Sequence, residues 1–169
     1  MRHIVTIFIL SAMLFLVACQ RDTANTDAKP FVLSTIKPIH ALVSAIAGDK
    51  VETRQLLPDN ASPHQYSVRP SDASALQAAD MIIRIDAQFE AQLDQALQHL
   101  QPKQQLITLS HANNLKLLPI RLFKWGSETA GDEHVGLHDH HEGQHDLHIW
   151  LDPQNAIIMA TTIQEALSQ

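Results

Sequence analysis

This chain is short of cysteine, of positive charge and of the motifs that mark common enzymes. Its 169 residues include one cysteine, which excludes an internal disulfide framework. Lysine and arginine number 12 against 18 acidic residues, and the net charge of −6 argues against a nucleic-acid-binding protein, which would carry a basic stripe. The His-Glu-x-x-His spacing occurs once, at 141–145, but it lies in the glycine-broken His-rich run and not in a helical pattern. No Gly-rich phosphate loop or Gly-x-Ser-x-Gly elbow occurs. We therefore expect a binding protein rather than an enzyme.

Long apolar runs are also scarce, and the one that is present lies at the start of the chain. Residues 4–17 follow Arg2 and have the length of the apolar core of a signal peptide, too short to cross a bilayer comfortably. The run ends in Leu16-Val17-Ala18-Cys19, which resembles the lipobox of lipoproteins, where the cysteine is acylated. Ordinary cleavage at or just beyond Ala18 is the alternative. Both interpretations predict export from the cytoplasm.

Composition separates this leader from a folded body. Residues 20–30 (QRDTANTDAKP) contain no large apolar side chain and are typical of a flexible tether. The rest of the chain is long enough for one domain with a core of its own, and 45% of all residues are apolar. We divide the chain into a signal peptide (1–18), a tether (19–30), a lobe (31–152) and a final helix (153–169).

Short apolar runs alternate with helical patterns through the folded body. Strands are predicted at 31–36, 51–57, 81–85 and 105–109, and helices at 38–47, 71–79, 89–100 and 153–168. Asp152 before Pro153 is a strong helix start, because aspartate caps the first turn and proline suits the first helical position. This alternation predicts an α/β fold, a parallel sheet flanked by helices, with ligands bound at the carboxyl ends of the strands.

Histidine is concentrated near the end of the predicted lobe. Six of the eleven histidines fall between His134 and His148, interleaved with acidic residues and glycines. Neutral imidazole is the commonest metal ligand in proteins and suits zinc and other first-row divalent ions. We interpret residues 126–146 as a His-rich loop. The apolar run from Leu147 (LHIWL) predicts a short buried strand that carries His148.

A second candidate ligand, His64, follows the second predicted strand. Pro63 has a fixed φ and stiffens the approach to this histidine. Taken alone, a loop histidine is more often a solvated side chain, and a histidine at a strand end more often bonds a backbone carbonyl. Spacing therefore does not decide the role of His64 or of His148.

Several motifs together resemble one protein family. The segment LLPDNASPHQYSVRPSD (56–72), a His-rich loop and LHIWLDP (147–153) resemble zinc-specific solute-binding proteins of ABC importers. The segments at 34–49 and 77–83 are similar to that family's first half. The resemblance implies that His64 and His148 are zinc ligands. It also implies a metal-gathering role for the loop histidines, which are His134, His138, His140, His141 and His145.

The resemblance carries expectations about the whole protein. Members of the family have two α/β lobes joined by a long helix, with the metal between the lobes. This sequence covers one lobe, so residues 153–169 are expected to begin the linking helix, and the other ligands are expected from elsewhere. The implied partners are Zn²⁺ as the transported ligand and an ABC permease of the inner membrane. The implied state is a monomeric receptor, periplasmic or anchored outside the cytoplasm through Cys19.

Two other interpretations stay open. An exported zinc buffer or metallochaperone would need only the His-rich loop, and a truncated, non-functional receptor would have a final helix unable to bury its apolar face. Imidazole sites also bind nickel, cobalt and copper, so residue types alone do not select zinc. Any histidine site should bind metal more weakly as the pH falls from about 7 to about 5.

Overall fold

The computed structural model describes residues 28–120 and 145–169. A four-stranded sheet, all parallel, has the order β2-β1-β3-β4. Its strands are β1 (Phe31–Ser34), β2 (Glu52–Gln55), β3 (Met81–Arg84) and β4 (Gln105–Thr108). The predicted parallel sheet is confirmed, and each strand is shorter than its apolar run. The predicted leader and Cys19, and the loop histidines His134, His138, His140 and His141, lie outside the described residues.

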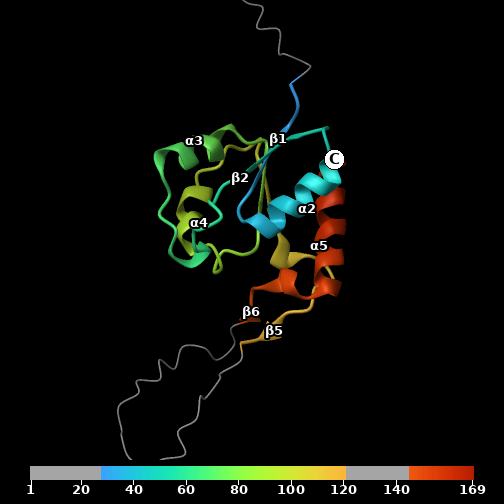
Figure 1. The fold of residues 1–169 in the computed structure, drawn as a ribbon. Helices are drawn as coiled ribbons and strands as arrows, with labels where there is room; N and C mark the ends of the chain where they lie inside the picture. The colour runs from blue at the N-terminus through green and yellow to red at the C-terminus, as the bar shows by residue number, and fades with distance from the viewer. Residues whose placement is uncertain (1–27, 121–144) are drawn as a thin grey trace, which may run out of the picture.

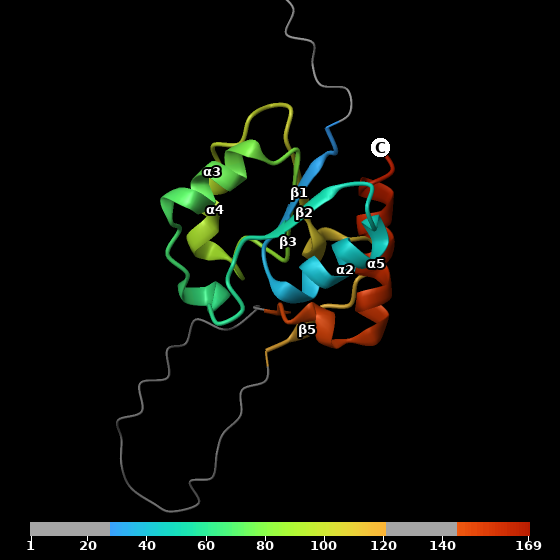
Figure 2. The ribbon, with the colours of Figure 1, turned by 45° about the horizontal axis from the view of Figure 1, so that its top comes forward.

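Helices cover both faces of this sheet. Helices α3 and α4 lie on one side, and α2 and α5 lie side by side on the other (Figures 1 and 2). The four helices are α2 (Lys37–Ala47), α3 (Pro70–Ala78), α4 (Ala91–Leu97) and α5 (Pro153–Ala166). The described residues also form three short 3-10 turns, η1 (Pro63–Gln65), η2 (Leu109–His111) and η3 (Ile149–Leu151). Among the described helices, none has the length and apolar character needed to cross a bilayer.

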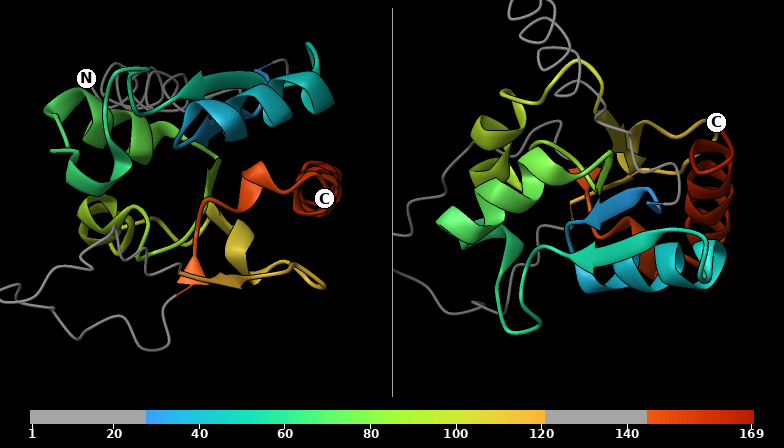
Figure 3. Two further views of the ribbon diagram at one scale, coloured as in Figure 1. Left: turned by 60° about the horizontal axis from the view of Figure 1, so that its bottom comes forward. Right: turned by 90° about the horizontal axis from the view of Figure 1, so that it is seen from above.

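The core lies where the two central strands meet the helices. Leu33 of β1 and Ile82 and Ile83 of β3 are fully buried, as expected for parallel strands covered on both faces. Helix α5 contributes Met159 and Ile163, which are also fully buried, and Figure 3 shows α5 packed beside α2. The final helix therefore buries its apolar face within this lobe. The interpretation in which that face has no partner is wrong.

The start of α5 agrees with the sequence prediction. The side chain of Asp152 caps the helix by accepting a hydrogen bond from the backbone N–H of Gln154, at 2.8 Å. Pro153 occupies the first helical position, where no backbone donor is needed.

The structure corrects the strand predicted from Leu147. A two-residue strand β6 (His145–Asp146) pairs antiparallel with β5 (Leu118–Pro119), and the backbone then turns into η3. Beyond β6, residues 147–151 pair with no strand in the described part of the chain, so the backbone bonds to itself. The N–H of Leu151 donates to the carbonyl of His148 at 3.1 Å. His148 thus lies at the start of a turn, not in a strand.

The helix predicted from Phe89 is also shorter than expected. Helix α4 begins at Ala91, and Phe89 lies in the loop between β3 and α4. Phe89, Leu93 and Leu97 are all buried, and their spacing matches one face of a helix. Only Leu93 and Leu97 belong to the helix, however. This correction places an aromatic ring at the carboxyl end of β3.

Candidate metal site

The fold brings His64 and His148 together. Their ring centroids are 5.9 Å apart, with 59° between the ring planes. Both line a pocket of about 270 Å³ whose other walls include Ile36 and Leu57, which follow the carboxyl ends of β1 and β2. The candidate site therefore lies at the ligand-binding edge predicted for a parallel sheet.

His64 belongs to the turn η1, and the segment after this turn is well anchored. Asp72 in the first turn of α3 accepts hydrogen bonds from the Tyr66 hydroxyl at 2.7 Å and from the backbone N–H of Arg69 at 2.8 Å. Burial, and then the neighbouring Asp72 carboxylate, raise the pKa of Tyr66 and keep its hydroxyl protonated as a donor. Pro63 precedes the histidine with its φ fixed. The backbone on both sides of His64 is thereby constrained.

His148 is oriented by a carboxylate. Asp146 Oδ1 lies 2.7 Å from His148 Nδ1 and also accepts the backbone N–H of His148 at 3.0 Å. In the tautomer that donates its Nδ1 proton to Asp146, the lone pair of Nε2 is left for a metal ion. A carboxylate behind the imidazole is the common arrangement around metal-bound histidines. The resemblance did not identify Asp146, although its position two residues before His148 was visible in the sequence.

Two aromatic side chains support the histidine pair. The Phe89 ring contacts His64 at 4.7 Å and His148 at 5.3 Å between centroids, both edge to face. The Trp150 ring lies 5.4 Å from Phe89 and 5.3 Å from His148. Trp150 therefore packs directly against the site. Phe89 was missed because its spacing indicated a helix.

The remaining described histidines differ in their relation to the site. His145 in β6 is exposed and lines a pocket of about 670 Å³ that also contains His64 and His148. The ring of His40 instead lies 3.1 Å from the hydroxyl of Ser34.

The described residues supply two donors at this position. Within the two described ranges, no group of three or more histidine, cysteine, aspartate or glutamate side chains is placed to hold a metal ion. A tetrahedral zinc site needs four donors. The histidine pair offers half of that number.

Comparison with known proteins identifies the family. Residues 32–169 match the family described as "Zinc-uptake complex component A periplasmic". The chain is 33% identical over 150 residues to the high-affinity zinc uptake system protein ZnuA of Yersinia pestis, covering 83% of this chain and 46% of that protein. It is 30% identical over 159 residues to the zinc-binding lipoprotein AdcA of Streptococcus pneumoniae, covering 92% of this chain and 29% of that protein.

Solved structures show the same fold. The Cd-bound periplasmic metal binding protein of Candidatus Liberibacter asiaticus superposes with a TM-score of 0.66 at 22% identity, over 83% of this chain and 45% of that one. The periplasmic zinc binding protein TroA of Treponema pallidum superposes with a TM-score of 0.63 at 23% identity, over 83% and 44%. The chain thus spans less than half the length of these relatives and corresponds to one lobe of a two-lobed fold. It belongs to the family of periplasmic zinc-uptake components.

Proposed function

We propose that this chain is the N-terminal lobe of an extracytoplasmic receptor that captures Zn²⁺ for an ABC-type high-affinity zinc uptake system. The observation that carries the proposal is the 5.9 Å separation of the His64 and His148 rings. Two imidazoles on one zinc ion, with bonds of about 2.0–2.1 Å at a tetrahedral angle, have ring centroids about 5 Å apart. A ring movement of about 1 Å therefore lets both histidines bind one ion.

Zinc is the cargo in this proposal, and the chain's own residues bind and orient it. His64 and His148 each donate one imidazole nitrogen, and Asp146 holds the His148 ring by its other nitrogen. Both histidines are exposed, so the ion reaches them without opening the lobe. Groups outside this lobe complete the coordination. The names of the relatives support zinc, while solved neighbours are also described as Mn-bound and Cd-bound.

The His-rich loop is assigned an accessory role in the same proposal. The described end of that loop, His145, lines a pocket together with His64 and His148, so metal collected by the loop is released beside the pair. A buffer that bound zinc through the loop alone would not need His64 and His148 to lie close together.

Export, and acylation of Cys19 as the membrane anchor, belong to the proposal as well. Comparing acyl labelling of the parent and of a Cys19→Ala variant tests the anchor.

Zinc titration calorimetry tests the proposal. The chain from residue 20 onward is compared with the same chain lacking residues 132–144, called here the loop-deleted chain. One zinc site is expected to survive the deletion and to weaken by more than about 100-fold in His64→Ala and in His148→Ala, because a lost ligand costs more than a lost supporting group. His99→Ala is the matched control and should leave the site unchanged, because His99 is an exposed histidine just after the end of α4.

The opposite pattern would support the buffer. In that case deletion of residues 132–144 removes all measurable zinc binding, and His64→Ala has no effect in the chain that keeps the loop.

A further inference from the structure

Residues 85–90 form the loop that carries Phe89, and the buried carboxylate of Glu90 holds this loop in place. Glu90 is fully buried and accepts hydrogen bonds from the Thr35 hydroxyl and from the backbone N–H groups of Ile85, at 3.2 Å, and Asp86, at 3.0 Å. Burial raises the pKa of Glu90 above its ordinary value, against the effect of these bonds. The side chain at the end of the loop is thus tied to the start of the loop and to the end of β1.

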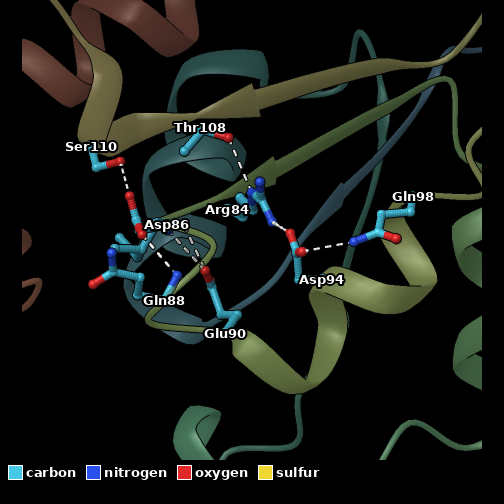
Figure 4. Close-up of polar contacts among 9 residues, drawn as sticks. Arg84, Asp86, Gln88, Glu90, Asp94, Gln98, Thr108 and Ser110 are labelled. Carbon is cyan, nitrogen blue, oxygen red and sulfur yellow. Dashed lines mark hydrogen bonds and ion pairs between the residues drawn. The ribbon is translucent and has the colours of Figure 1, made fainter.

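A second carboxylate ties the same loop to its neighbour. Asp86 accepts the backbone N–H of Gln88 at 2.8 Å and the hydroxyl of Ser110, from the turn after β4 (Figure 4). The backbone N–H of Ser110 also donates to the carbonyl of Ile85, at 3.0 Å. The loop therefore has little freedom to move away from the sheet edge.

The Phe89 ring, which this loop carries, contacts both His64 and His148. Phe89 is 2% exposed, so its position is set from behind by packing. Both imidazoles meet the same phenyl ring edge to face, at interplanar angles of 72° for His64 and 88° for His148. Because both imidazoles contact the same phenyl ring, the position of that ring affects the distance between them.

We infer that Phe89 is a positioning residue that sets the separation of the two imidazoles, and that Glu90 holds Phe89 in place through the loop. The inference rests on the proposed function, because it assigns a role toward a metal bound by His64 and His148. Phe89 itself donates nothing to the ion. Its effect is on geometry.

The separation matters for the choice of metal. Zinc is commonly tetrahedral, whereas manganese favours octahedral sites with ligands at right angles. Two imidazoles at a right angle on one ion lie closer together than two at a tetrahedral angle. A support that holds the rings of His64 and His148 at the wider separation therefore favours zinc over manganese.

Affinity and selectivity measurements on the loop-deleted chain test this role. Phe89→Ala is expected to lower zinc affinity by about 10- to 100-fold, as for other groups that orient metal ligands, and to reduce the ratio of zinc to manganese affinity. Phe89→Leu keeps most of the apolar volume and should have a smaller effect on both. When the variants are loaded with Co²⁺, Phe89→Ala should lose more of the intense visible absorption of tetrahedral cobalt than Phe89→Leu does.

Glu90 is tested through its dependence on Phe89. Glu90→Gln keeps the shape of the side chain but places an NH₂ group where a carboxylate oxygen accepted a backbone N–H, so the loop loosens. Zinc affinity should fall by about tenfold. In the Phe89→Ala background the same substitution should cost nothing further, because the two residues act through one ring.

A destabilised core is the main competing explanation, and Ile163→Ala controls for it. Ile163 is fully buried in α5 and absent from the lining of both pockets that contain the histidine pair. If Ile163→Ala lowers zinc affinity as much as Phe89→Ala, the positioning role is wrong. It is also wrong if Phe89→Leu, Phe89→Ala and Glu90→Gln all keep the affinity and metal ratio of the parent while His64→Ala loses zinc. If His64→Ala binds zinc like the parent, the proposed function itself fails.

Discussion

Replacing Asp146 by alanine separates metal binding from folding stability. Asp146 Oδ1 holds His148 by two contacts, at 2.7 Å to Nδ1 and at 3.0 Å to the backbone nitrogen. The side chains of Asp146 and His148 are 51% and 47% exposed. Water can reach both groups after the substitution, so we expect the free energy of unfolding to change by less than about 0.5 kcal/mol.

The effect on zinc should be much larger. Without the carboxylate, the His148 ring can rotate and can carry its proton on either nitrogen, and both changes reduce the fraction of rings ready to bind. Loss of such a supporting group costs about 10- to 100-fold in metal affinity. Because water partly replaces the carboxylate at this exposed site, we expect the lower end, about tenfold, which corresponds to about 1.4 kcal/mol. Asp146→Asn keeps an acceptor oxygen and should fall between the parent and the alanine variant.

A second aspartate provides the matched control. Asp152 caps α5 and lies on the same stretch of chain, so Asp152→Ala should lower the free energy of unfolding by about 1 kcal/mol and leave zinc affinity close to that of the parent. Competition with a chromophoric chelator measures zinc affinity, and urea unfolding measures stability. Unchanged zinc affinity in Asp146→Ala, or equal losses of affinity in both variants, would refute the orienting role.

Three further predictions concern packing and pH. Met159→Ala removes a fully buried side chain of α5 and should lower the free energy of unfolding by about 2–5 kcal/mol in urea; a loss below about 1 kcal/mol would mean that α5 does not pack on this lobe. The hydrogen bond from Arg84 holds the pKa of Asp94 below its usual value, so this pair stabilises the fold above about pH 4, and the stabilisation is lost as the pH falls through the lowered pKa. Asp94→Asn should therefore cost about 0.5–1 kcal/mol at pH 7 and less at pH 2, and an equal cost at both would contradict the assignment. Zinc affinity should fall between about pH 7 and pH 5, because protons compete with the ion for imidazole, and an affinity independent of pH would exclude a histidine site.

Local sequence patterns determined the class of fold. Each central strand begins with apolar residues that the fold buries, and the alternation of such runs with helical spacing predicts a parallel sheet covered by helices. The start of α5 could also be predicted locally. The Asp152 side chain accepts a hydrogen bond from a backbone N–H of the first turn, and Pro153 occupies the first helical position, where no backbone donor is needed. The family motifs singled out His64 and His148, whose chemistry depends on the imidazole itself.

Only the tertiary structure decided how these parts meet. The spacing of apolar residues reports which side chains are buried and not what they touch, so Phe89 was assigned to a helix face when its ring supports both histidines. The run from Leu147 was apolar enough for a strand, yet it has no described strand to pair with and closes into the turn η3. The pairing of His64 with His148 depends on contacts between segments placed by the whole sheet. No local pattern carries that information, because packing across the sheet is set by residues far apart in the chain.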